Sequence, residues 1–151
     1  MNQHKLKKRE EQMLIVFSRL GSLYYLSFTG QEILRDKILG LDGPRRKILI
    51  IQDHDHRYEF KLIDLCEVTD CKLKKTYGAM NGGELNKNEL GKYLNKIALE
   101  FYLKNESQPI ALEFYNGVTD SLYEMAELEN RAKRWEAMLS KMLPYQQPKI
   151  A

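Results

Sequence analysis

The stretch TDSLYEMAELENRAKRWEAMLSKML, from Thr119 to Leu143, decides the fold that this sequence predicts. Its apolar residues recur at alternating spacings of three and four, which places them on one stripe of an α-helix. The members of this stripe are Met125, Leu128, Ala132, Trp135, Leu139 and Met142. An apolar stripe of this length needs a surface to cover, and the preceding part of the sequence predicts a sheet that supplies one.

Both ends of this predicted helix carry boundary signals. Ser121 with Glu124 has the form of a capping box, in which the two side chains satisfy backbone N–H groups at the helix start. Pro144 has no backbone N–H and therefore ends the helix. The helix also offers two i, i+4 pairs of opposite charge, Glu127 with Arg131 and Glu129 with Lys133.

The composition is that of an ordinary globular protein, with 43% hydrophobic and 30% charged residues in a chain of 151. The net charge is +3, and residues 1–12 hold +2 of it, four basic residues against two acidic ones. A nucleic-acid-binding domain usually has a far stronger basic surface, so nucleic acid is not an expected partner. No apolar run reaches the ~18–20 residues of a membrane span.

Two cysteines, Cys66 and Cys71, make neither a disulfide framework nor a zinc spacing. We therefore expect both thiols to be buried as small hydrophobic groups. A reducing, cytoplasmic location follows from this cysteine usage, and the cytoplasmic face of a membrane is the alternative.

The sequence predicts a helix over residues 3–20, because Met13 and Phe17 are one turn apart and Gly21 suits the position after the last turn. The alternative is a strand over 13–17, since isoleucine, valine and phenylalanine favour sheets. The predicted organisation is an N-terminal basic and amphipathic helix at 1–21, a module at 22–143 and a C-terminal tail at 144–151.

From Ser22 onward, short β-type segments separated by turn residues predict about seven strands. The segments are LYYLSF (23–28), KILGL (37–41), RKILII (46–51), RYEFKLI (57–63), CKLKKTY (71–77) and the hexapeptide IALEFY at 97–102 and 110–115. Residues 78–96 form a predicted loop or helix excursion from the sheet. Because no crossover helices separate the strands, the sheet should be an antiparallel meander.

The two copies of IALEFY predict an antiparallel hairpin, joined by the polar turn sequence before Pro109. One face of this hairpin would be wholly apolar and would receive the Trp135 stripe. The other face would carry the Glu100 and Glu113 carboxyl groups together with Tyr102 and Tyr115.

The predicted fold class is α+β: a strongly bent antiparallel sheet or open barrel of about seven strands, closed by the C-terminal amphipathic helix and preceded by an N-terminal helix. This arrangement resembles the pleckstrin-homology-like fold in strand count, in the final helix with its inward Trp135, and in the bend IDLCEVTDCKL (63–73). It is also similar to bacterial proteins of unknown function that carry such a domain. The resemblance covers residues 22–143 and implies a binding or scaffolding module.

The residues offer few reactive combinations. In the turn Asp53-His54-Asp55-His56, His54 and His56 are weak metal-ligand candidates, and a solvated hairpin turn is the alternative. Glu100 and Glu113 could approach each other as in a glycosidase, although paired glutamates on a sheet are more often ordinary surface. No nucleophile elbow, glycine-rich phosphate loop or zinc-protease motif occurs, and no cofactor is expected.

Two basic groups are candidates for binding an anion: Arg45, Arg46 and Lys47 at a hairpin turn, and Lys72, Lys74 and Lys75 on a strand. The sequence therefore favours a non-enzymatic module that binds a protein partner or a second copy of itself, through the N-terminal helix or an exposed strand edge. The alternatives are a membrane-surface or anionic-ligand binder that uses these cations, and a small enzyme whose site has no recognisable motif.

Overall fold

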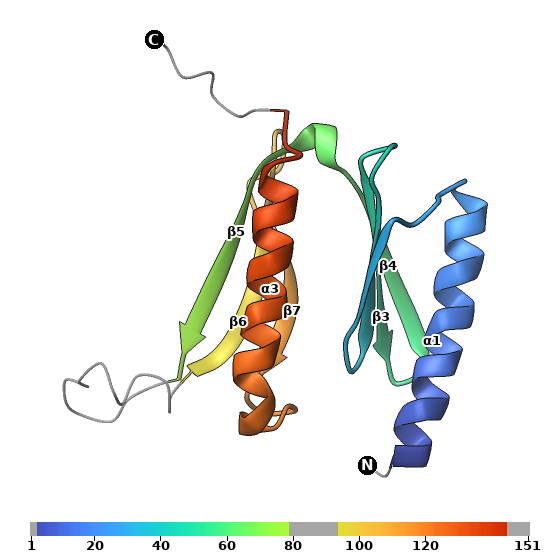
Figure 1. Ribbon diagram of the computed structural model, residues 1–151, viewed down its shortest axis with the longest axis vertical. Helices are drawn as coiled ribbons and strands as arrows, with labels where there is room; N and C mark the ends of the chain where they lie inside the picture. The colour runs from blue at the N-terminus through green and yellow to red at the C-terminus, as the bar shows by residue number, and fades with distance from the viewer. Residues whose placement is uncertain (1–2, 79–93, 145–151) are drawn as a thin grey trace, which may run out of the picture. The chain divides into compact units, whose positions relative to one another are not determined.

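A computed structural model describes residues 3–78 and 94–144 (Figure 1). In chain order the elements are α1 (Gln3–Leu23), β1 (Gly30–Ile33), β2 (Lys37–Asp42), β3 (Lys47–His54), β4 (Arg57–Asp64), the 3-10 turn η1 (Leu65–Glu67), β5 (Val68–Tyr77), β6 (Leu94–Leu103), β7 (Ile110–Asn116), the 3-10 turn η3 (Leu122–Glu124) and α3 (Met125–Ser140). The excursion predicted at 78–96 lies mostly outside the described residues, and 94–96 open β6. Neither described helix has an apolar window long enough to cross a bilayer.

The chain forms two compact units, Met1–Glu67 and Val68–Ala151. The predicted α+β class is confirmed, but the strands form two antiparallel sheets, of order β1-β2-β3-β4 and β5-β6-β7, rather than one hydrogen-bonded sheet of seven. At the junction, η1 interrupts the extended backbone, and the Cys66 N–H donates to Asp64 Oδ1 at 2.9 Å. The division after Glu67 therefore falls inside the module predicted at 22–143.

In the first unit, α1 packs on one face of the four-stranded sheet and contacts β2 and β3. Met13 and Phe17, one turn apart on α1, are buried together with Ile38, Leu49 and Ile51 of the sheet. This cluster explains why residues 13–17 are helical although their side chains favour strands: the helix presents both apolar residues to the same surface. The helical prediction over 3–20 is confirmed.

Two glycines allow an aromatic ring to sit between α1 and the sheet. Phe28 stacks on Phe17 with ring centroids 4.5 Å apart. A Cβ at Gly40 of β2 would lie only 2.7 Å from the Phe28 ring, and one at Gly21 of α1 only 2.8 Å from it. Gly21 is therefore a packing position inside the helix and not the residue that follows it, as its identity had suggested.

The helix ends at Leu23, and the left-handed residue that follows it is Tyr25, with φ of 57°. The Leu26 N–H donates to the Gly21 carbonyl at 2.8 Å and the Tyr25 N–H to the Ser22 carbonyl at 3.2 Å, the bonds of a Schellman motif. The strand predicted at 23–28 is therefore wrong. Those residues end α1 and carry the chain to Phe28, and the first strand begins only at Gly30.

In the second unit, α3 covers one face of the three-stranded sheet and contacts β5, β6 and β7 (Figure 1). Ala132, Trp135 and Leu139 are buried on that side, so the centre of the predicted stripe is confirmed. The hairpin predicted for the two IALEFY segments is also confirmed, since β6 and β7 pair antiparallel.

Two glutamates of α3 reach β5, which is an edge strand of this sheet. Glu136 accepts a hydrogen bond from the Leu73 N–H, and Glu129 pairs with Lys75 rather than with Lys133. The other predicted helical pair, Glu127 with Arg131, is present at 2.6 Å. The Leu73 N–H of this edge is thereby satisfied by a side chain instead of by another strand.

A bulge changes the face that one predicted surface residue occupies. Ile97 pairs with Tyr115 and Ala98 with Glu113, so β7 has one extra residue, Phe114, at this point. As a result Tyr115 shares the side of the buried Ile97 and is only 2% exposed. The expectation that Tyr115 lies on the polar face is wrong, because strict alternation does not survive an inserted residue.

Candidate functional site

The predicted metal-ligand candidates lie at the β3–β4 hairpin. Asp55 and His56 both have positive φ, 55° and 71°, as a two-residue type I′ turn requires. Asp53 is buried and already engaged: it accepts from Arg9 Nε at 2.8 Å and from the His56 N–H at 2.8 Å. The carboxylate thus joins α1 to the hairpin rather than facing the imidazoles.

The imidazoles themselves are exposed, and His54 Nε2 lies 3.3 Å from Glu59 Oε2. Across residues 3–78 and 94–144 no three His, Cys, Asp or Glu side chains come together as a metal site would require. His54 therefore has one carboxylate beside it, that of Glu59, and the described residues complete no metal site around His54 or His56.

The basic turn between β2 and β3 is organised by a carboxylate. Asp42 is fully buried and accepts from the Ser27 N–H at 2.9 Å, from the Arg45 N–H at 3.1 Å and from Arg45 Nη1 at 3.0 Å. Burial by itself raises the pKa of Asp42, but these hydrogen bonds outweigh it, so that the net pKa lies below the ordinary value. The positive charge of Arg45 is thus paired with the Asp42 carboxylate within the same turn. Arg46, beside it, holds a left-handed backbone, and its carbonyl accepts from the Leu65 N–H.

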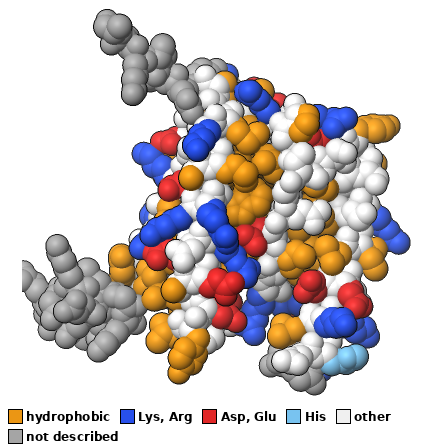
Figure 2. All heavy atoms as spheres, in the orientation of Figure 1, with side chains coloured by type: hydrophobic (Ala, Val, Ile, Leu, Met, Phe, Trp, Pro, Cys, Tyr) orange, Lys and Arg blue, Asp and Glu red, His pale blue; other side chains and the backbone are white. Residues whose placement is uncertain are grey.

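The lysines of β5 do not form one group. Lys75 reaches Glu129 of α3, on the covered side of the sheet. Lys72 lies on the opposite side, 3.3 Å from Asp70 and 5.9 Å from the centre of the Tyr102 ring, and Lys74 lies 3.9 Å from Glu100. An approaching anion would meet carboxylates beside each of these cations. On the face drawn in Figure 2, basic and acidic side chains likewise stand side by side.

The two glutamates considered as a catalytic pair belong to this mixed surface. Glu100 accepts from the Tyr102 hydroxyl at 2.8 Å, and this bond, with burial, raises the pKa of the phenol. Glu113 lies 3.4 Å from Lys96 and accepts from Asn116 Nδ2 at 3.2 Å. Their strand partners are Ala111 and Ala98, so the carboxyl groups are not directly opposite each other. Each carboxyl group thus interacts with neighbouring side chains of its own, as is usual for charged residues on a solvent-exposed sheet.

The cysteines lie in different environments. Cys71 is buried, and burial, followed by the charges of Glu136 and Asp70, raises the pKa of its thiol to about 12. Cys66 is exposed in η1, so the expectation that both are buried is wrong for this residue. The two fall on opposite sides of the boundary between the units.

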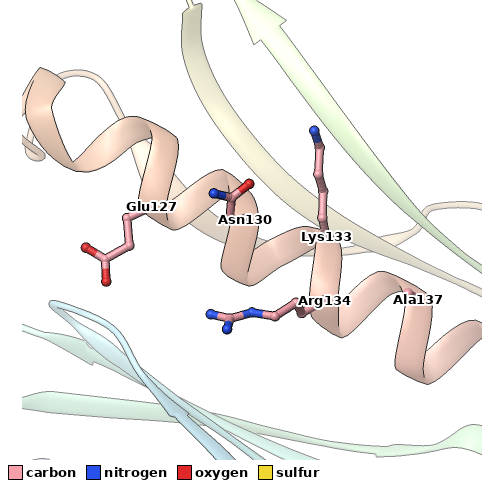
Figure 3. A pocket seen from close by; sticks show the side chains of 5 residues that line it. All are labelled: Glu127, Asn130, Lys133, Arg134 and Ala137. Atoms are coloured by element: carbon pink, nitrogen blue, oxygen red, sulfur yellow. The ribbon is translucent and has the colours of Figure 1, made fainter.

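A hollow runs along α3, and the described residues that line it all belong to that helix (Figure 3). The residues are Glu127, Asn130, Lys133, Arg134 and Ala137. Figure 3 shows the charged side chains of Glu127 and Lys133 pointing apart from each other. Binding sites for small molecules usually have walls from several elements and converging polar groups. The described residues that line this hollow come from one helix only, so it lacks the first of these features.

The most distinctive surface of the first unit lies where α1 ends beside β4. Tyr24 contacts Phe60 of β4 with ring centroids 5.8 Å apart, and their exposed fractions are 37% and 43%. We call these two residues the aromatic patch. Leu23 and Tyr25, next to Tyr24 in the chain, are exposed as well, at 65% and 83%. Sequence reasoning missed this surface because it assigned 23–28 to a strand.

Strand β4 is itself an edge of the four-stranded sheet. Its two faces differ: Tyr58, Phe60 and Leu62 share the side of α1, as their alternation predicts, and the intervening Glu59 and Lys61 are exposed on the other side. An edge strand offers unpaired backbone N–H and C=O groups to any extended chain that approaches it. Unlike β5, whose edge is met by Glu136, β4 has no helix carboxylate bonded to its outer edge among the described hydrogen bonds.

Comparison of this chain with protein-family models, with curated proteins and with solved structures gives no match. The site must therefore be judged from its own geometry, which offers an open strand edge with aromatic side chains beside it.

Proposed function

We propose that this protein is a non-enzymatic, pleckstrin-homology-like interaction module that binds a protein strand along β4. The observation that carries the proposal is the open edge of β4 with the aromatic patch, Tyr24 and Phe60, beside it. An added strand would satisfy the outward backbone groups, and the aromatic rings would cover apolar side chains of the partner. In residues 3–78 and 94–144, the element order of seven strands followed by a helix with an inward Trp135 supports the pleckstrin-homology-like part of the proposal.

Of the two binding elements that the sequence suggests, the strand edge has more support than the N-terminal helix. The apolar residues of α1 that would attract a partner helix, Met13 and Phe17, are buried against the sheet of the same unit. Removing residues 1–20 would therefore expose the core of that unit and would not be a clean test of binding. Substitutions on the surface of β4 leave this core intact.

The test is a photo-cross-linking amino acid placed at position 61 of the chain, in cells that produce the protein. The matched control carries the same amino acid at position 133, an exposed lysine of α3. We expect a discrete covalent protein adduct from position 61 and none from position 133. The adduct should disappear when Phe60→Pro is added, because proline removes an N–H that the edge offers to a partner strand. Equal labelling from both positions, or none from position 61, would refute binding along β4.

A further inference from the structure

We infer that the partner of β4 is β4 of a second copy of this chain, paired antiparallel with Phe60 opposite Phe60. This inference rests on the proposed function and identifies its partner. It is carried by the self-complementary order of residues along the strand: the sequence RYEFKLI, from Arg57 to Ile63, places Glu59 and Lys61 symmetrically about Phe60.

The hydrogen bonds within the hairpin fix which groups of β4 face outward. The Leu65 N–H donates to the Arg46 carbonyl at 2.8 Å, and a two-residue turn joins the strands at the other end. In an antiparallel ladder, bonded and non-bonded pairs alternate. Counting from either end, the backbone groups of Tyr58, Phe60 and Leu62 point away from β3, as do those of Asp64 at the end of the strand. A new strand that pairs with Arg57 to Ile63 must hydrogen-bond to the first three positions.

In a two-fold symmetric pairing, each residue whose backbone groups point away from β3 must therefore lie opposite another such residue of the second copy. When the pairing is centred on Phe60, Tyr58 of each copy meets Leu62 of the other, and Phe60 meets Phe60. All three outward positions are then satisfied on both strands at once.

Charge selects this register from its neighbours. Centred on Phe60, Glu59 of each copy faces Lys61 of the other, which gives two opposite-charge pairs on one face of the joined sheet. In a register centred one residue earlier, Glu59 would face Glu59 of the other copy. In a register centred one residue later, Lys61 would face Lys61. Like charges directly opposite each other destabilise a strand pair.

One other register has complementary charge, but it is short. Centred on Tyr58, it would place Arg57 opposite Glu59, and the turn at Asp55 and His56 would end the pairing after that point. The register centred on Phe60 extends from Arg57 to Ile63 on both strands. It forms the longer ladder and is the one we infer.

The same symmetry joins the aromatic surfaces. A two-fold axis perpendicular to the sheet keeps like faces on the same side, so the rings of Tyr24 and Phe60 from both copies meet above one continuous sheet. Phe60, 43% exposed in the single chain, would then be covered by its counterpart. The polar face of β4 is thus complementary to the polar face of the second copy, and the aromatic face to its aromatic face, in the same register.

The experiment is a charge swap followed by analytical ultracentrifugation of the full chain. We expect the unaltered protein to sediment as a dimer of the 17.8 kDa chain. Glu59→Lys and Lys61→Glu should each weaken the dimer on the order of tenfold or more, because each creates two like-charge pairs. The double variant Glu59→Lys/Lys61→Glu restores opposite charges in the inferred register and should recover the dimer.

Arg57→Glu is the matched control, because Arg57 faces Ile63 and no charge in this register. It should leave the dimer unchanged, whereas loss of the dimer would favour the register centred on Tyr58 and overturn ours. Circular dichroism of every variant establishes that the monomeric forms are folded. Failure of the double variant to recover the dimer would likewise overturn the inference.

The outcomes also separate this inference from the proposed function. An unaltered protein that stays monomeric, with a cross-linked adduct of a different protein at position 61, would refute self-pairing and retain the binding edge. Absence of both the dimer and any adduct would refute the two together. An adduct of twice the chain mass at position 61 would support both, provided that the dimer of the chain without the cross-linker is lost in Lys61→Glu and regained in the double variant.

Discussion

At the scale of single residues, Asp42 shows how one carboxylate sets the shape of a turn. Its oxygens accept from the Ser27 and Arg45 backbone N–H groups and from the Arg45 guanidinium. Asp42→Asn keeps the size of the side chain but loses the charge, and an amide nitrogen replaces one of the two acceptor oxygens. We expect a loss of about 1–2 kcal/mol in the free energy of unfolding at neutral pH, measured by urea denaturation.

The pH dependence of this loss follows from the lowered pKa of Asp42 in the folded state. A carboxyl group with a lowered folded pKa contributes stability above its unfolded pKa, near 3.8, and that contribution is lost as pH falls through the folded value. The difference in free energy of unfolding between the unaltered protein and Asp42→Asn should therefore be largest at neutral pH and should shrink below pH 3.8. A difference that grows on acidification would contradict this account.

The two thiols should differ sharply in reactivity. Cys66 is exposed, whereas burial raises the pKa of Cys71 to about 12 and keeps its thiol protonated far above neutral pH. With an excess of a disulfide reagent at pH 8, we expect one thiol to react rapidly and the second only on denaturation. Cys66→Ser should abolish the rapid phase, whereas rapid labelling of that variant would show that Cys71 is accessible.

At the scale of elements, the packing of α1 on β2 depends on the missing side chain of Gly40. A methyl group there would overlap the rings of Phe17 and Phe28. Gly40→Ala should therefore reduce stability by about 1–3 kcal/mol through overpacking, as measured by thermal and chemical unfolding. Combining it with Phe28→Leu, which removes part of the obstructing ring, should cost less than the sum of the single changes. Simple additivity would show that the ring and the new methyl group do not compete.

The same elements show where sequence patterns predict well and where they fail. The 3.6-residue rhythm of Met125 to Met142 and the alternation from Tyr58 to Leu62 are local, so they identify α3 and β4 without any knowledge of the fold. Residues 23–28 were misassigned because aromatic side chains favour strands in general. The helix is terminated there by the left-handed turn at Tyr25, after which Phe28 packs between Gly21 and Gly40. Residues as far apart in the sequence as Phe28 and Gly40 leave no periodic signal.

At the scale of the whole molecule, the net charge is only +3, and several candidate anion-binding cations lie beside carboxylates. Arg45, Lys72 and Lys74 each have a carboxylate within 4 Å. Each unpaired cation near an anionic bilayer contributes about 1 kcal/mol, and paired ones contribute less. We expect no salt-sensitive co-sedimentation with vesicles that contain anionic lipid.

A matched variant makes this expectation sharper. Asp70→Asn with Glu100→Gln removes the carboxylates beside Lys72 and Lys74 and should increase vesicle binding at low salt. Strong salt-sensitive binding of the unaltered protein would contradict the expectation and would favour the anionic-surface alternative.

The sequence by itself determined the α+β fold class, the helices at both ends, the antiparallel hairpins and the side of the C-terminal helix, marked by Trp135, that packs on the sheet. Those features depend on residues near one another in the chain, where hydrophobic period and turn chemistry act directly. The tertiary structure alone decided that the strands divide into two sheets after Glu67, that Tyr115 turns inward at a bulge, and that Tyr24 meets Phe60 beside an open edge. Strand pairing and surface juxtaposition depend on contacts between distant residues, and a strand's own pattern does not specify which neighbour it will have.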